Sequence, residues 1–125
     1  MIDGVGLDTV EPERIAKAVS RWGSRFLKRI FTDRELLDCR NKHDITGSFA
    51  ARFAVKEAAM KALGTGRSEG IGWTDIEVVV GKGGRPYLVF HGTAQKRMRG
   101  RRAHASLTHD GRTAAAMVVI ETGEE

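Results

Sequence analysis

The sequence predicts a small α+β domain spanning residues 1–125, in which an antiparallel sheet packs against helices. Two observations lead to this fold class. Helical periodicity extends from about Glu13 to Leu63, whereas strand-like runs joined by tight turns fill most of the chain from Trp73 to Glu121. A chain of 125 residues fits one domain without a linker, although at this size oligomerisation is a common way to add stability.

The chain opens with a predicted short strand whose apolar residues are Ile2, Val5 and Leu7. The glycines between them lack side chains and would let another part of the backbone approach closely. Asp8 stands at the end of this strand.

A helix is predicted from about Glu13 to Ile30, and its apolar and basic residues lie on separate stripes. The apolar, core-facing stripe consists of Ile15, Val19, Trp22, Phe26 and Ile30. The basic stripe consists of Arg14, Lys17, Arg21, Arg25, Lys28 and Arg29. Gly23 weakens the centre of this helix, so the pattern allows a bend or a break there.

Two further helices follow. Thr32 and Glu35 have the spacing of a capping box, which predicts a short helix that ends near Arg40–Asn41. The next helix is predicted from about Thr46 to Leu63, and Gly64 supplies its C-cap.

The remaining elements are four strand-like runs in two hairpins, with a short helix between the hairpins. The first hairpin comprises Trp73–Val80, a turn at residues 81–84 and Pro86–Phe90. The helix covers about Thr93–Arg99. The second hairpin comprises His104–His109, a turn at Asp110-Gly111-Arg112 and Thr113–Glu121. Asp-Gly between two strand-like runs is a strong hairpin signal.

Composition limits the possible functions. The 41% hydrophobic and 30% charged content is ordinary for a globular protein, and no apolar run approaches the roughly 20 residues of a membrane helix. The N-terminus lacks the features of a signal peptide, so we expect a cytoplasmic protein with no membrane partner. Cys39 is the only cysteine, which excludes an internal disulfide. The net charge of +5 predicts an anionic partner, and nucleic acid, phosphate cofactors and acidic proteins all satisfy that.

The third helix carries candidate functional residues. Glu57 and Lys61 are four residues apart, so they project from the same side of the helix. In most helices this spacing forms only a solvated ion pair of small energetic value. Arg52 lies nearby, and Lys56 falls on the apolar face, where a cation needs an anion or an interface unless its side chain extends to solvent.

Three further features suit phosphate or metal binding. The Gly64-Thr65-Gly66 loop exposes backbone amides that can hold phosphate oxygens, although its glycines also suffice to end the helix. Asp8 and Glu57 could form the kind of carboxylate pair that holds magnesium beside substrate phosphates, but spacing alone does not establish a pair 49 residues apart. His109 ends a strand beside a tight turn, where an imidazole can contact phosphate or is simply exposed.

Four motifs occur in order along the chain. They are Gly4-Val5-Gly6-Leu7-Asp8 followed by Arg14-Ile15; Phe31-Thr32-x-x-Glu35; Ala51-Arg52-Phe53-Ala54-Val55-Lys56-Glu57-Ala58-x-x-Lys61-Ala62-Leu63-Gly64-Thr65-Gly66; and Ser106-Leu107-Thr108-His109 leading into Ala114-Ala115-Ala116. Together they resemble the holo-[acyl-carrier-protein] synthase family of small phosphopantetheinyl transferases, from Met1 to Glu121. The departures, a brief connection between the second and third helices and the loop around Arg67–Gly72, leave the local cofactor and carrier contacts open.

This resemblance implies a magnesium-dependent transfer of 4'-phosphopantetheine from coenzyme A to a serine of an apo acyl carrier protein, with release of adenosine 3',5'-bisphosphate, in fatty acid biosynthesis. Asp8 and Glu57 would bind magnesium, and Lys61 would contact the pyrophosphate as the third catalytic residue. The residues implied in binding coenzyme A are Arg52, Lys61, Gly64, Gly66, Thr108 and His109. Glu57 is the candidate base for the serine proton, and the sequence does not separate it from Asp8.

The resemblance also gives the basic stripe an interpretation. The family docks acidic carriers on its first helix, so the expected docking residues are Arg14, Arg21, Arg25 and Arg29. The family is also trimeric, with active sites between subunits, so His109 would act in its own site or in that of a neighbour.

Two other functions are compatible with parts of the sequence. A nucleic-acid-binding protein is favoured by the basic run at residues 97–102, but the aromatic residues are few, and those of the helices lie on apolar stripes instead of on an exposed stacking platform. An inactive module that only binds carriers is opposed by the presence of both carboxylates and Lys61. We therefore expect no nucleic-acid partner.

Overall fold

The computed structural model describes residues 1–64 and 70–123, and the following account concerns those residues. In chain order the elements are β1 (Ile2–Val10), α1 (Pro12–Trp22), α2 (Ser24–Ile30), α3 (Asp33–Arg40), α4 (Ile45–Leu63), β2 (Ile76–Val80), β3 (Pro86–Phe90), α5 (Gly92–Met98), β4 (Arg102–His109) and β5 (Ala114–Glu121). Two short 3-10 helices, Trp73–Asp75 and Lys82–Gly84, precede β2 and β3.

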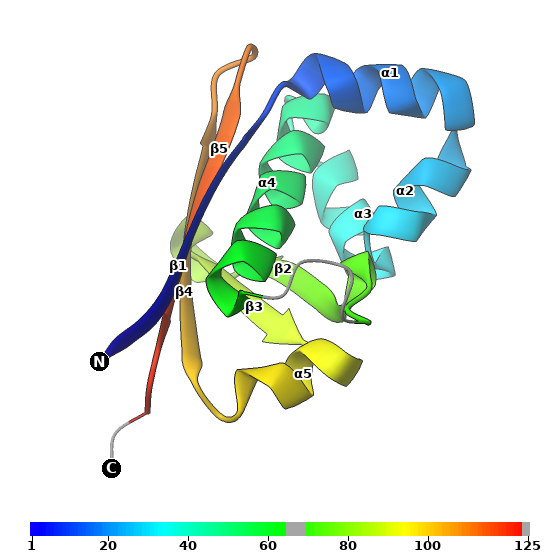
Figure 1. Cartoon of the computed structure of the whole chain (residues 1–125). Helices are drawn as coiled ribbons and strands as arrows, with labels where there is room; N and C mark the ends of the chain where they lie inside the picture. Colours follow the sequence, from blue (N-terminus) through cyan, green and yellow to red (C-terminus); the bar gives the residue numbers. More distant parts are fainter. Residues whose placement is uncertain (65–69, 124–125) are drawn as a thin grey trace.

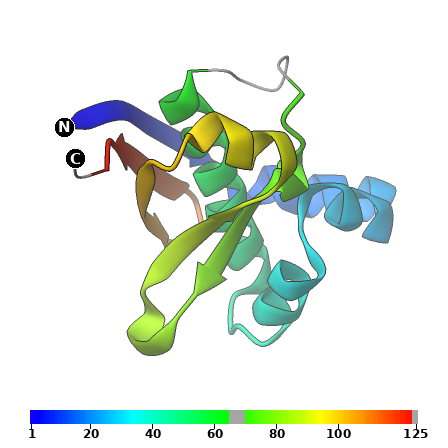
Figure 2. The ribbon, with the colours of Figure 1, turned by 90° about the horizontal axis from the view of Figure 1, so that it is seen from below.

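The strands form two antiparallel groups. The first is a three-stranded sheet in the order β1-β5-β4, and the second is the β2–β3 hairpin. Helix α4 runs along one face of the three-stranded sheet, while α1, α2 and α3 lie on the far side of α4 (Figure 1). The start of β1 and the end of β5 lie side by side, since Ile2 pairs with Glu121 (Figure 2). The predicted α+β class, with an antiparallel sheet packed against helices, is confirmed.

The glycines of β1 allow α4 to lie directly against the strand. A Cβ atom at Gly4 would overlap the carbonyl oxygen of Ala62, and one at Gly6 would overlap the carbonyl oxygen of Ala58. The predicted close approach of another backbone is therefore confirmed, and the backbone in question belongs to α4.

The predicted first helix is broken at Gly23 into α1 and α2, which meet at a corner (Figure 1). Gly23 has φ 62° and ψ −143°, a conformation that a residue with a side chain rarely adopts. Its backbone N–H still donates to the carbonyl of Val19, so α1 is closed before the chain turns.

Helices α3 and α4 begin and end as their sequences predict. The capping box is present, because Thr32 accepts from the N–H of Glu35 while Glu35 accepts from the N–H of Thr32. At α4 the carboxylate of Asp44 caps the N-terminus, and Gly64 ends the helix in the left-handed conformation, with φ 77° and ψ 14°. Among the described residues, no helix is long and apolar enough to cross a membrane.

The counterion of Lys56 is the buried carboxylate of Glu35. The Lys56 ammonium group is fully buried and donates to Glu35 Oε1 at 2.8 Å and to the carbonyl oxygens of Trp73 and Ile76 at 3.1 Å and 2.6 Å. The other carboxylate oxygen of Glu35 accepts from the N–H of Val78. This group joins α3, α4 and β2, and the alternative of a lysine extending to solvent is wrong.

Several boundaries differ by a few residues from the prediction. The strand expected from Trp73 begins at Ile76, because Asp75 accepts from the N–H of Gly72 and closes a 3-10 turn first. In the second hairpin, the carboxylate of Asp110 accepts from the N–H groups of Arg112 and Thr113, which fixes the tight turn between β4 and β5.

Candidate active site

Asp8, Glu57 and Lys61 meet between β1 and α4. The Lys61 ammonium donates to Asp8 Oδ1 at 2.8 Å and to the carbonyl oxygen of Leu7 at 3.0 Å. The other carboxylate oxygen of Asp8 is buried and has no hydrogen-bond partner within the described residues. The helical spacing places Glu57 and Lys61 on the same side of α4, and the lysine there forms an ion pair with Asp8 of β1.

The two carboxyl groups lie close enough to share a proton. Burial is the largest cause that raises the pKa of Glu57, and the adjacent Asp8 carboxyl group also raises it, while Lys61 and Arg14 oppose the shift; the resulting pKa is about 7. In the absence of a metal ion, the pair therefore holds a proton near neutral pH, because burial disfavours the ionised form of Glu57 and the adjacent carboxylate of Asp8 repels it.

The residues present fit a magnesium ion. Asp8 has a buried oxygen without a donor, and the charge of a divalent cation would relieve the repulsion that raises the pKa of Glu57. No group of three or more metal-ligating side chains occurs in the part of the chain that the structure describes. Two carboxylates alone suit magnesium, which keeps several waters and also binds substrate phosphates.

The basic stripe begins at this site. Arg14 lies within electrostatic reach of Glu57 and lines a small cavity of about 110 Å³ beside Phe26 and Phe53. Further along, Arg25 and Arg29 line a cavity of about 320 Å³ at the corner between α1 and α2. The face expected to dock the carrier thus leads from an exposed corner to the carboxylate pair.

His109 lies near the N-terminal end of α4, and Arg52 lies near the middle of this helix. His109 Nδ1 is 3.4 Å from the carboxylate of Asp44, and it would contact a Cβ atom on Gly47. The buried Arg52 guanidinium donates to the Ser48 carbonyl at 3.2 Å, and its Nε and Nη2 atoms have no partner among the described residues.

Within one chain His109 is far from the carboxylate pair. Glu57 is ten residues beyond Gly47 in α4, which corresponds to about 15 Å along the helix axis. The structure therefore brings Asp8, Glu57 and Lys61 together, but it does not bring His109 to them.

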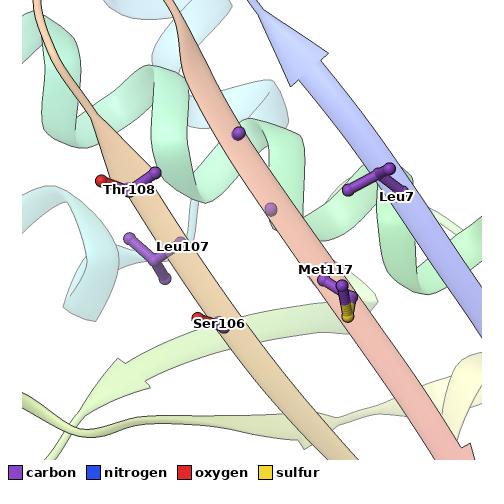
Figure 3. Close-up of a pocket in the computed structure, with 7 residues that line it drawn as sticks. Leu7, Ser106, Leu107, Thr108 and Met117 are labelled. Carbon is purple, nitrogen blue, oxygen red and sulfur yellow. The ribbon is translucent and has the colours of Figure 1, made fainter.

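Thr108 lies on the opposite face of the sheet from α4. It borders a shallow groove of about 200 Å³, whose other lining residues include Leu7, Ser106 and Met117 (Figure 3). Leu7 and Met117 are 59% and 45% exposed, which is unusual for large apolar side chains of one sheet face. Of the predicted loop residues, Gly64 ends α4 as described above, whereas Gly66 lies outside the described residues.

Sequence reasoning missed two relationships. Arg14 was assigned only to docking, yet it also lies near Glu57. Glu35 was assigned only to capping, yet it is the counterion of Lys56. Its position four residues before the apolar Cys39 placed it on the buried face of α3, and this was the available signal.

Known proteins are similar to this chain in sequence and in fold. The sequence profile of the 4'-phosphopantetheinyl transferase superfamily matches residues 4–117. A holo-[acyl-carrier-protein] synthase from Koribacter versatilis is 50% identical over 124 residues, which cover 97% of this chain and 99% of the relative.

Two solved structures are similar over most of their lengths. The Helicobacter pylori holo-[acyl-carrier-protein] synthase in complex with coenzyme A has a TM-score of 0.82 and 31% identity, with 94% of this chain and 99% of that chain covered. The Bacillus anthracis holo-(acyl-carrier-protein) synthase in complex with CoA (3',5'-ADP) has a TM-score of 0.83 and 34% identity, with 98% and 99% covered. The chain therefore belongs to the 4'-phosphopantetheinyl transferase superfamily and, within it, to the holo-[acyl-carrier-protein] synthases. Members of this family are transferases.

Proposed function

We propose that this chain transfers 4'-phosphopantetheine from coenzyme A to a serine hydroxyl of an acidic apo acyl carrier protein, with magnesium as its metal ion. The products are the holo carrier and adenosine 3',5'-bisphosphate, and the reaction serves fatty acid biosynthesis in the cytoplasm. The observation that carries this proposal is the meeting of Asp8, Glu57 and Lys61 beside Arg14, in a member of this transferase family.

The proposed reaction exchanges one phosphorus–oxygen bond for another. The serine oxygen attacks the phosphorus that carries the pantetheine arm, the bond to the bridging pyrophosphate oxygen breaks, and the leaving bisphosphate takes the electron pair. Lys61 is placed to stabilise the charge that develops on the leaving group. Magnesium held by Asp8 and Glu57 would neutralise further charge on the pyrophosphate.

Glu57 is better suited than Asp8 to accept the serine proton. One oxygen of Asp8 is committed to the ion pair with Lys61 at 2.8 Å. Glu57 would receive the proton directly or through a water molecule.

A homotrimer accounts for the residues that a single chain keeps apart. The exposed apolar groove around Leu7 and Met117 is a surface that a second copy can cover. If the sites lie between copies, His109 of one copy faces the carboxylate pair of the next, and coenzyme A binds across the boundary. This proposal assigns the unpaired nitrogens of Arg52 to a phosphate of coenzyme A.

The activity is tested by mass spectrometry. The protein is incubated with coenzyme A, magnesium and several apo acyl carrier proteins, and each carrier should gain the mass of phosphopantetheine. No mass gain on any carrier would refute the transferase proposal. Glu57→Ala should abolish transfer, whereas Arg21→Ala should mainly raise the carrier's KM, because only Glu57 lies at the reacting atoms. Equal, mild effects of both changes would contradict these roles.

Mixing two inactive variants tests where the site lies. Glu57→Ala and His109→Ala chains are unfolded together and refolded as mixed assemblies. If each site takes Glu57 from one copy and His109 from another, about a quarter of the sites in an equal mixture regain both residues. No recovery, with both variants folded and assembled, would place both residues in the same chain's site.

A further inference from the structure

The ammonium group of Lys56 uses its whole hydrogen-bonding capacity inside the protein. An ammonium group has three N–H donors, and here they meet Glu35 Oε1 at 2.8 Å and the carbonyl oxygens of Trp73 and Ile76 at 3.1 Å and 2.6 Å. The side chain is fully buried. Lys56 therefore has no donor left for a substrate, although it is the residue before Glu57 in the sequence.

The carboxylate of Glu35 is itself held by two backbone groups. Its Oε1 atom accepts from the N–H of Thr32 at 2.9 Å, and its Oε2 atom accepts from the N–H of Val78 at 2.8 Å. Hydrogen bonds to a charged group are short and directional, so they restrict the position of the groups that they join. The Lys56 side chain consequently ties α4 to α3, to the 3-10 turn at Trp73 and to the start of β2.

The face of α4 that lies against the sheet has no comparable polar contact. Helical periodicity places four buried alanines on that face, Ala51, Ala54, Ala58 and Ala62. A Cβ atom at Gly4 or Gly6 of β1 would overlap carbonyl oxygens of the helix, so the two backbones are close. Contacts between small apolar groups are non-directional, and apolar cores lose a unique arrangement before they lose stability. This face therefore defines how near α4 lies to β1 more closely than where α4 lies along the strand.

We propose that Lys56 is a positioning residue for the transfer reaction, because its three hydrogen bonds fix where Glu57 stands relative to Asp8. This inference rests on the proposed function and deepens it. Lys56 and Glu57 are consecutive, so a shift or rotation of α4 at Lys56 also moves Glu57. Asp8 belongs to β1, so the distance between the two carboxyl groups depends on the position of α4 relative to that strand. Functional groups need placement within about 0.5 Å, and a misplacement of about 1 Å can lower a rate about 100-fold.

A purely stabilising role is the alternative interpretation. Removing two charges from water is costly, so a buried ion pair often contributes less to stability than apolar residues of the same volume. Buried polar groups can instead select one arrangement of helices among several. Arg52, one turn before Lys56, provides no substitute, since its one hydrogen bond within the described residues goes to Ser48 of the same helix.

Kinetic comparison with a second destabilised variant separates positioning from stability. Lys56→Met is compared with Met98→Ala, which removes a buried side chain from α5 and should also lower stability. Each variant is assayed at a temperature at which circular dichroism shows it folded. Lys56→Met should lower kcat roughly 10- to 100-fold with little change in the carrier's KM, whereas Met98→Ala should keep kcat within about twofold of the wild type. Equal kcat values for the two folded variants would overturn the inference.

Magnesium binding gives a readout that does not depend on transfer. Calorimetric titration of the free protein with magnesium chloride should show a Kd about tenfold higher for Lys56→Met and unchanged for Met98→Ala, because only Lys56 controls the spacing of the carboxyl groups. If Lys56→Met does not fold, Glu35→Gln decides the question. It keeps an oxygen for Lys56 but turns an NH2 group toward the N–H of Thr32 or Val78, so it should change kcat and Kd in the same direction by a smaller factor.

Two results would count against the proposals in different ways. Variants at Lys56 and Glu35 that unfold more easily, yet bind magnesium and turn over like the wild type, would show that the ion pair serves stability alone. The inference would then be wrong and the proposed function would stand. If the wild-type protein modifies no carrier, the proposed function fails and the inference fails with it.

Discussion

Lys56→Met should destabilise the protein severely. The change removes a buried charge and three hydrogen bonds, those to Glu35, Trp73 and Ile76. It leaves the Glu35 carboxylate buried without its cation, although the N–H groups of Thr32 and Val78 still donate to it. Methionine is similar in length, so the loss comes from electrostatics more than from a cavity.

The expected cost is about 3–5 kcal/mol, the usual range when one partner of a buried ion pair is removed. Total stabilities of about 5–15 kcal/mol make this about a fifth or more of the free energy of unfolding. With a urea dependence near 2 kcal/mol per molar, the unfolding midpoint should fall by about 2 M. Unfolding is followed by circular dichroism at one fixed protein concentration, since assembly would couple to folding.

Lys17→Met is the matched control. Lys17 also pairs with a carboxylate, that of Glu13 at 3.4 Å, but the two side chains are 75% and 71% exposed. Its loss should change stability by less than about 0.5 kcal/mol. Glu35→Gln combined with Lys56→Met should cost less than the sum of the two single changes, because each single change leaves its partner unpaired. A loss below about 1 kcal/mol for Lys56→Met would refute the reasoning.

Two further predictions concern the carboxylate pair and the strand that carries it. The pKa of Glu57 is raised to about 7 without metal, so magnesium must displace a proton to bind below that pH. Calorimetry should therefore show that the affinity for magnesium rises about tenfold per pH unit up to pH 7 and is constant above it. An affinity that is the same at pH 6 and pH 8 would contradict the shared proton. Gly6→Ala should cost at least about 1–3 kcal/mol in urea unfolding, because its Cβ atom would overlap the Ala58 carbonyl oxygen. Gly72→Ala, at a glycine with φ −86° whose Cβ atom would come no closer than 3.7 Å to Asp75, is its control and should cost less, whereas equal costs would mean that β1 moves away from α4 easily.

Local signals in the sequence predicted most of the fold. Caps and turns depend on residues a few positions apart, so Thr32 with Glu35, Gly64, and Asp110-Gly111 could each be interpreted without the rest of the chain. The break at Gly23 was only an allowed outcome, because whether a glycine bends a helix or ends it depends on what the following turn packs against.

The candidate site was less accessible to sequence reasoning, since its contacts join distant segments. Periodicity placed Glu57 and Lys61 on one side of α4, but it could not show that Lys61 pairs with Asp8 or that Arg14 lies near Glu57. The same limit applies to Lys56, whose partner Glu35 lies 21 residues earlier on another helix. Motif resemblance supplied the list of residues, whereas the distances between them come from the packing.

In the opening strand β1, a local sequence motif determines a contact between distant segments. Asp8 reaches Lys61 and Glu57 because β1 runs almost in contact with α4, and this contact is possible only where β1 carries no side chain toward the helix. A side chain at Gly6 would push the strand away from Ala58, one residue from Glu57, and would separate the carboxylates that are proposed to share one metal ion. The glycines of Gly4-Val5-Gly6-Leu7-Asp8 are therefore as necessary to the geometry of the site as the aspartate that follows them.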